Sequence, residues 1–166
     1  MSIDKNQAII EYLSDATTGC PQIISNPLFF NFIDAKNNNK QLVVLSNDIA
    51  VQRPFIDGSV LKRYTFTIID YKSVAYQAIV KTIGTSYTNE NVEEMFESQS
   101  IIDWITEQDE LQHYPDFGET CEIEKITALT ENPRLNGVDI SVSPALARYS
   151  ISIQVTYLDI SKKLWT

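Results

Sequence analysis

Cysteine, histidine and glycine are scarce in this sequence, which holds 2 Cys, 1 His and 5 Gly in 166 residues. Two cysteines are too few for a disulfide framework, and the spacing of Cys20 and Cys121 matches no zinc-binding pattern. We expect both thiols to be reduced and packed, in a protein made in a reducing cytoplasm. With only 5 Gly and 6 Pro, low-complexity structure is excluded as well.

Long apolar runs and a basic amino-terminal segment are also missing. The first ten residues, MSIDKNQAII, lack the pattern of a signal peptide. The longest apolar runs are far shorter than the roughly 20 residues that a membrane span needs. We therefore expect no membrane association and no secretion by a standard signal. The 43% hydrophobic content predicts one folded domain that spans residues 1–166.

Basic residues are absent between Lys81 and Lys125, a stretch that contains twelve Asp and Glu. The net charge of the chain is −9, so the remainder is about +3. An acidic segment repels nucleic-acid backbones, which disfavours a direct grip on DNA there. The simplest interpretation is a solvated helix face that keeps the protein soluble.

Two segments have the apolar spacing of a helix. The first is expected to begin at a Ser2 cap and to stop at Gly19. The second should run from about Val92 to Leu111 and be closed by Pro115 and Gly118. Its buried stripe is predicted to contain Val92, Met95, Phe96, Ile102 and Ile105, widened by Ile101 and Trp104.

Strand signals occupy most of the remaining chain. Strands are expected within residues 28–33, 41–53, 61–73, 120–129 and 149–158, while 74–88 fit either a helical turn or a loop. Residues 131–147 are rich in Pro, Gly and Asn and are expected to form a long loop. The predicted class is α+β: a mostly antiparallel sheet of four to five strands with two helices on one face, in the order α-β-β(-β)-α-β-β.

The only histidine, His113, lies at the expected end of the long helix, where its cationic form suits the helix dipole. A metal site would need more ligands than His113 and Asp109, which stand one helical turn apart. No nucleophile motif or phosphate-binding loop is present, and Cys121 is expected inside a strand. We therefore predict no enzyme activity, no catalytic residue and no cofactor. A small acidic hydrolase or metal-binding protein centred on His113 is the alternative.

Three stretches together resemble the tail terminator (tail completion, or minor capsid) proteins of long-tailed phages and of prophages of Gram-positive bacteria. They are VQRPFIDGSVLKRYTFTIIDYKS (51–73), MFESQSIIDWITEQDELQHYPDFG (95–118) and PALARYSISIQVTYL (144–158). The most specific parts are the W-I-x-E-Q pattern at the helix end, with Pro115 after it, and the final strand that begins Arg148-Tyr149. The resemblance extends from about Ile9 to Trp165.

The resemblance implies a structural virion protein with a lambda-type tail terminator fold, in which helices pack on one side of a sheet. Such proteins form a homohexameric ring at the head-proximal end of the tail tube. The ring ends tube polymerisation and joins a head-completion or connector protein, and genomic DNA passes through it without specific binding. Localisation in the virion tail, after synthesis in the host bacterial cytoplasm, is implied too. Another head–tail connector or minor capsid component is the alternative within this class.

The acidic helix would then face either the ring lumen, where it repels phosphates, or a neighbouring subunit. The candidate acidic residues are Glu93, Glu97, Asp103 and Glu107. The candidate basic partners on a neighbouring copy are Arg53, Lys62, Arg63 and Lys72.

Overall fold

A computed structural model describes residues 3–25, 28–31, 41–74, 90–141 and 145–165. For residues 41–43, 45–49, 73–74 and 90–95 it describes the backbone but not the side chains. The class is α+β, as predicted. In chain order the elements are α1 (Lys5–Ser14), α2 (Pro21–Ile24), β1 (Leu28–Phe30), β2 (Gln41–Pro54), β3 (Val60–Val74), α3 (Glu90–Glu110), β4 (Cys121–Ala128), β5 (Arg134–Asp139) and β6 (Ala145–Asp159).

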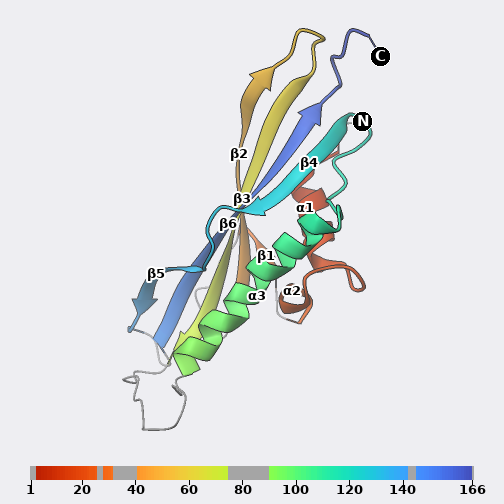
Figure 1. The fold of residues 1–166 in the computed structure, drawn as a ribbon. Coiled ribbons are helices and arrows are strands. Elements are labelled where there is room, and N and C mark those ends of the chain that lie inside the picture. Colours follow the sequence, from red (N-terminus) through yellow and green to blue (C-terminus); the bar gives the residue numbers. More distant parts are fainter. Residues whose placement is uncertain (1–2, 26–27, 32–40, 75–89, 142–144, 166) are drawn as a thin grey trace.

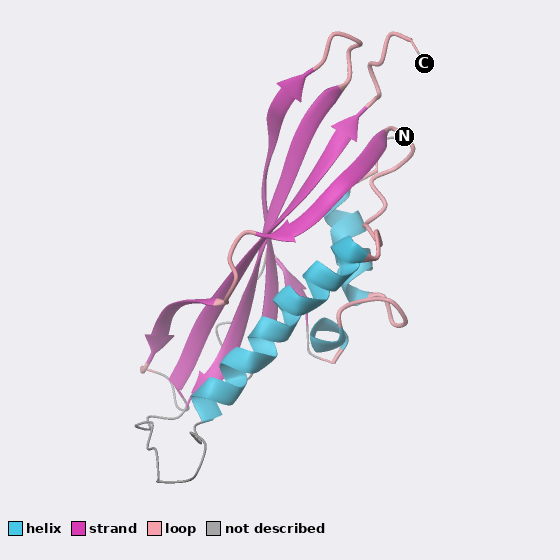
Figure 2. Cartoon of the chain, viewed as in Figure 1, coloured by secondary structure: helices cyan, strands magenta, loops and turns pink. Residues whose placement is uncertain are grey.

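The strands form one strongly twisted sheet in the order β1-β2-β3-β6-β4, with β5 as a second neighbour of β6 (Figures 1 and 2). Every described pairing is antiparallel except that of β1 with β2. Strand β6 has fifteen residues, all of which pair with β3. On its other side β6 pairs with β4 along its second half and with β5 along its first half.

The core lies between one face of this sheet and the helices. Alternation in β3 places Tyr64, Phe66 and Ile68 on the covered face, opposite Val155, Ile153 and Ile151 of β6. Helices α1, α2 and α3 all contribute buried residues to the same cluster. Burial of each large side chain contributes about 1.5–3 kcal/mol relative to exposure, so the covered face supplies most of the stability of the fold.

The opposite face of the sheet is rich in hydroxyl groups, because the same alternation directs the polar residues of β3 and β6 away from the helices. Thr65 and Thr67 of β3 lie half-buried opposite Gln154 and Ser152 of β6. The hydroxyls of Thr67 and Ser152 are 3.2 Å apart and share a hydrogen bond.

Helix α1 begins and ends inside the bounds expected from sequence. Asp4 caps it by accepting a hydrogen bond from the Asn6 N–H at 2.9 Å, and the expected Ser2 cap lies outside the described residues. The helix ends at Ser14, so the expectation that it continues to Gly19 is wrong. Gly19 instead closes the following turn, because its N–H donates to the Asp15 carbonyl at 2.9 Å.

Helix α3 matches the expected span closely, but its buried stripe differs. Ile101, Ile102, Trp104 and Ile105 are buried, as predicted. Phe96 is 62% exposed, so its assignment to the core is wrong. At 100° per residue Phe96 falls on the side of the helix opposite to the buried residues. The side chains of Val92 and Met95 lie outside the description.

The end of α3 comes before the residues expected to close it. Gln112 adopts a left-handed conformation with φ of 54°. The N–H of Gln112 donates to the Asp109 carbonyl, and the N–H of His113 donates to the Gln108 carbonyl at 2.9 Å. These two bonds form a Schellman motif, which satisfies the last helix carbonyls. The helix therefore ends at Glu110, close to the expected Leu111, and the closing motif lies at Gln112 rather than at Pro115 and Gly118.

The region 131–147 is not the continuous loop that its composition predicts. Within it, β5 pairs with the first half of β6, and β6 itself begins at Ala145. A β-bulge between Leu135 and Gly137 lets one extra residue fit into β5. The segment left open between a helical turn and a loop lies almost entirely outside the described residues, which end at Val74 and resume at Glu90.

Candidate functional site

The acidic residues of α3 divide into two groups. Asp103 and Glu107 stand one turn apart and are both exposed on the outer side of the helix. Glu97 lies on the flank of the helix, and its carboxylate points toward β3, although its side chain stays 55% exposed. The side chain of Glu93 lies outside the description. Of the four candidate acidic residues, only Asp103 and Glu107 are therefore shown to lie on a solvent-exposed acidic face of α3.

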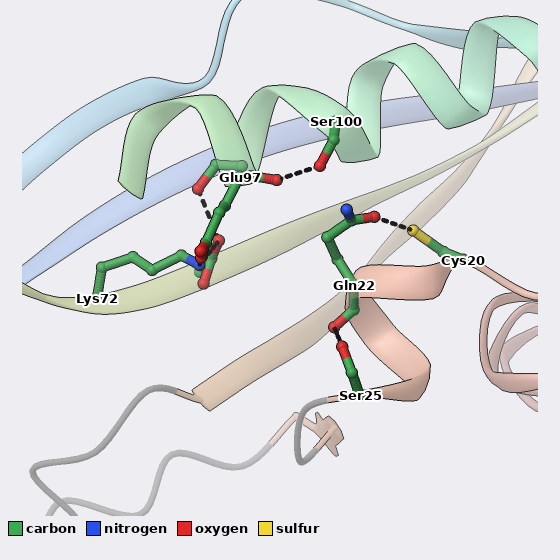
Figure 3. A network of polar contacts seen from close by, with 8 residues as sticks. Cys20, Gln22, Ser25, Lys72, Glu97 and Ser100 are labelled. Atoms are coloured by element: carbon green, nitrogen blue, oxygen red, sulfur yellow. Dashed lines mark hydrogen bonds and ion pairs between the residues drawn. The ribbon is translucent and has the colours of Figure 1, made fainter. Parts of the chain in front are cut away.

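Lys72 is buried inside its own chain, with 4% exposure, so its assignment to a basic surface is wrong. Its Nζ lies 2.7 Å from Glu97 Oε2 (Figure 3). The same Nζ lies 3.4 Å from Asp70 Oδ2. The hydroxyl of Ser98 also donates to Asp70 Oδ2 at 2.6 Å. This cluster joins α3 to β3, and a single unpaired member would carry a large desolvation cost.

The other expected cations have different surroundings. Lys62 forms an ion pair with Asp159 of β6 at 2.5 Å. Arg53 is exposed, and its guanidinium lies 5.2 Å from the ring of Phe55. Arg63 is half-buried opposite Thr156, and its buried Nε has no hydrogen-bond partner among the described residues. Arg53 and Arg63 remain candidates for contact with a partner, whereas Lys62 and Lys72 are used within the fold.

His113 lines a cleft of about 490 Å³ between α1 and the segment that follows α3. Its Nδ1 hydrogen-bonds the Gln108 side chain, and its carbonyl accepts from the Tyr12 hydroxyl at 2.9 Å. Burial raises the pKa of Tyr12 above its usual value, so this hydroxyl stays a donor. Acidic side chains also line the cleft: Asp4, Glu11, Asp15 and Asp116. The contacts of His113 are those of a residue that fixes the end of α3.

Asp109, considered with His113 as a metal ligand, has a different role. Its Oδ1 accepts from the Ile126 N–H at 2.9 Å and from the Tyr114 hydroxyl at 3.2 Å. The Tyr114 hydroxyl also lies 3.4 Å from the Glu124 carbonyl. These contacts satisfy backbone groups on the outer edge of β4. Within the described ranges, no group of three or more His, Cys, Asp and Glu side chains is arranged to hold a metal ion.

An apolar surface lies at the β2–β3 turn, which sequence reasoning did not single out. Ile56 in the turn is 94% exposed, and Phe55 beside it is exposed as well. Trp165, exposed and near the carboxyl terminus, lines a cleft of about 740 Å³ with these residues. The Leu164 N–H donates to the Asp57 carbonyl at 2.7 Å, which holds the carboxyl-terminal segment against the turn. We call Phe55, Ile56, Leu164 and Trp165 the tip patch.

A second exposed apolar surface lies on β5, at the other end of the sheet (Figure 1). Leu135 and Val138 are 53% and 45% exposed, and Ile140 just after the strand is exposed too. Sequence reasoning missed this surface because it assigned the segment to a loop. The available signal was the pair of apolar residues, Leu135 and Val138, on either side of Asn136 and Gly137.

Both cysteines have the state expected from sequence. Cys20 is buried and Cys121 is half-buried, and neither forms a disulfide. Burial raises the pKa of the Cys20 thiol to about 11, which keeps it protonated and poorly nucleophilic at neutral pH.

No known protein-family model matches the chain, and no curated protein sequence is significantly similar to it. Among the described helices, none is both long enough and apolar enough to cross a membrane.

Proposed function

We propose that the chain is a structural virion protein, a tail terminator that forms a hexameric ring at the head-proximal end of a phage tail tube. The ring ends tube polymerisation and presents the surface that joins the head-completion or connector protein. Two observations support this proposal. The sequence resembles tail terminators over three stretches, and the helices pack on one face of a mostly antiparallel sheet, which is the arrangement that the resemblance implies.

The observation that carries the proposal is the pair of exposed apolar surfaces at opposite ends of one sheet. The tip patch contains Ile56 and Trp165, and the β5 end contains Leu135 and Val138. Clustered exposed apolar side chains mark protein contacts. A protein that works between a tube and a head needs two such ends, and we assign the tip patch to the tube.

The outer face of α3 is assigned to the lumen of the ring. No Lys or Arg occurs from Glu90 to Glu110, and Asp103 and Glu107 point into solvent. Carboxylates on this face would repel phosphates, so DNA could slide without being held. The burial of Lys72 against Glu97 removes one of the inter-subunit pairs that the alternative placement requires.

The test is a capping assay with the cognate tube protein. Tubes polymerised with the wild-type chain should be shorter than tubes polymerised alone and should carry a ring at one end in negative-stain micrographs. Ile56→Lys should abolish capping without unfolding the chain, because Ile56 is almost fully exposed. Leu111→Lys, at an exposed apolar residue just after α3, is the matched control and should cap normally.

Tubes of unchanged length without rings would refute the terminator role. Rings that bind a head-side connector but never a tube end would support the connector alternative. The lumen assignment has its own test, since Asp103→Lys combined with Glu107→Lys should leave capping intact but lower the yield of infectious particles at least tenfold. An unchanged yield would refute the lumen assignment and indicate that the acidic face only keeps the protein soluble.

A further inference from the structure

Strand β5 is an edge strand that the described part of the chain leaves uncovered. It pairs with β6 on one side, and no described strand lies on its other side. Five of its six residues are exposed. The neighbouring edge, on β4, is closed by Asp109 and Tyr114. An open edge with exposed apolar side chains is a template for pairing with another strand.

The bulge in β5 determines which side chains share a face. Leu135 lies opposite Tyr149, and Val138 lies opposite Ala147. Directly paired residues point to the same face, and Tyr149 and Ala147 are two residues apart on β6, so Leu135 and Val138 are on one face. Arg134 lies opposite Ser150 and Asp139 lies opposite Leu146, which places both charged residues on the other face.

This arrangement makes β5 complementary to itself. In an antiparallel pair of two β5 strands related by a two-fold axis, Arg134 of each copy stands opposite Asp139 of the other. Leu135 of each copy then stands opposite Val138 of the other. Opposite charges and apolar residues are the favourable cross-strand pairs. Without the bulge, Arg134 and Asp139 would fall on opposite faces and could not meet.

We propose that β5 binds β5 of a second copy of this chain, so that one antiparallel sheet continues through both copies. The proposal concerns the free protein and does not depend on the terminator role; in a terminator, this β5 pair would have to separate before the same surface could meet the head side. The Asp139 carboxylate is already oriented, since its Oδ1 accepts from the Ser141 N–H at 2.9 Å and from the Ser141 hydroxyl at 2.6 Å. Its Oδ2 is then the oxygen that the guanidinium of Arg134 from the other copy would bind.

The bulge glycine also fits this interface. Gly137 has φ of 148°, a conformation that residues with a Cβ rarely adopt. In the proposed pair, Gly137 of one copy faces Asn136 of the other, close to the two-fold axis. A residue without a side chain there lets the two backbones approach each other closely.

The test is a charge-swap cycle followed by sedimentation velocity over a range of protein concentrations. The wild-type chain should dimerise reversibly, because an interface of one short strand is small. Arg134→Asp alone or Asp139→Arg alone places like charges opposite each other and should raise the dimer dissociation constant at least tenfold. The double variant should bring the dissociation constant back to within about threefold of wild type.

Lys162→Asp, an exposed charge reversal in the carboxyl-terminal segment, is the control and should dimerise like wild type. Circular dichroism should show that every variant stays folded, because the three substituted residues are all exposed. As a second measurement, amide hydrogen exchange in β5 should slow as the protein concentration rises, whereas exchange at Ile126 should not change.

A chain that stays monomeric at every concentration would overturn the proposal, and so would single variants that dimerise like wild type or a double variant that fails to recover. Six-copy rings that are insensitive to both single variants would overturn the β5 interface and leave the terminator role intact. A reversible dimer that follows the charge-swap cycle but never caps tubes would support the β5 interface and refute the terminator role.

Discussion

Strands β4 and β5 pair with the same side of β6, yet they differ in how far their side chains are buried and in whether their outer edges are covered. Ile126 of β4 is 1% exposed, and Asp109 and Tyr114 satisfy backbone groups on the outer edge of that strand. The side chains of β5 are mostly exposed, and its outer edge has no described strand beside it. Two strands on one edge thus have different purposes: β4 closes the domain, while β5 remains available for contact.

Helix α3 is the physical origin of this difference. It packs against β4, and the segment that follows it folds back so that Tyr114 reaches the Glu124 carbonyl. An unprotected strand edge promotes unwanted pairing, and covering it with a helix is a common solution. Beside β6 the sheet therefore has one protected edge strand, β4, and one unprotected edge strand, β5, and the following predictions test that contrast.

The largest expected effect comes from truncating the buried residue of β4. Ile126→Ala should lower the free energy of unfolding by about 3 kcal/mol, because it removes methylene groups from a fully packed site. Val138→Ala in β5 should lower it by less than about 0.5 kcal/mol, since Val138 is exposed in the single chain. Chemical denaturation of both variants at low protein concentration measures the difference. Equal losses would show that β5 is as integral to the core as β4.

A smaller loss should follow when the closure of the β4 edge is removed. Asp109→Ala leaves the Ile126 N–H without its acceptor and removes one of the two acceptors of the Tyr114 hydroxyl, so it should cost about 2 kcal/mol. Asp103→Ala, on the outer side of the same helix, is the control and should change stability by less than about 0.5 kcal/mol. Hydrogen exchange at Ile126 should accelerate only in the Asp109 variant. Unchanged exchange there would mean that the edge is protected by something else.

Regular alternation made much of this fold predictable. In β6, Tyr149, Ile151 and Ile153 repeat every second residue, so both the strand and its buried face follow from sequence. Strand β5 did not follow, because Asn136 and Gly137 are typical of loops, and the strand exists only because β6 extends beyond the end of β4. Its pairing is a tertiary effect that no local pattern encodes.

The candidate site was predictable only in part, for a similar reason. The outward position of Asp103 and Glu107 follows from helical spacing. The burial of Lys72 does not, because its partner Glu97 is on another element and 25 residues away in the chain. Likewise, the role of Asp109 depends on a backbone N–H of β4 that only the folded chain brings near.

Lowering the pH should reduce the stability of the fold more through Asp159, in the half of β6 that pairs with β4, than through Asp139 of β5. Burial alone would raise the pKa of Asp159, but hydrogen bonds from Lys62 and Ser161 lower it to about 2. The folded pKa lies below the unfolded value, so the stabilisation is present above about pH 4 and is lost as the pH falls through 2. We expect a loss of about 1 kcal/mol over that range, allowing for solvent screening.

Lys62→Met should make stability less dependent on pH between 4 and 2, which denaturant titrations at several pH values can measure. Asp139, at the β5 end, also accepts hydrogen bonds from a serine two residues later, and these lower its pKa. It is exposed, so Asp139→Asn should leave the acid dependence of the single chain nearly unchanged. An equal effect of the two substitutions would contradict the assignment of the acid response to the Lys62 pair.

The smallest effect expected is a gain, at the turn that brings Tyr114 to β4. Gln112 holds a left-handed conformation that favours glycine, so Gln112→Gly should raise the free energy of unfolding by about 0.5 kcal/mol. Gly137→Ala makes the opposite change in β5, so it should lower the free energy of unfolding of the single chain and also weaken dimerisation, because φ of 148° strains a residue with a Cβ. Thermal unfolding and sedimentation velocity together separate the two results. A loss of stability in Gln112→Gly would mean that the side chain of Gln112, rather than its backbone conformation, maintains the closure of β4.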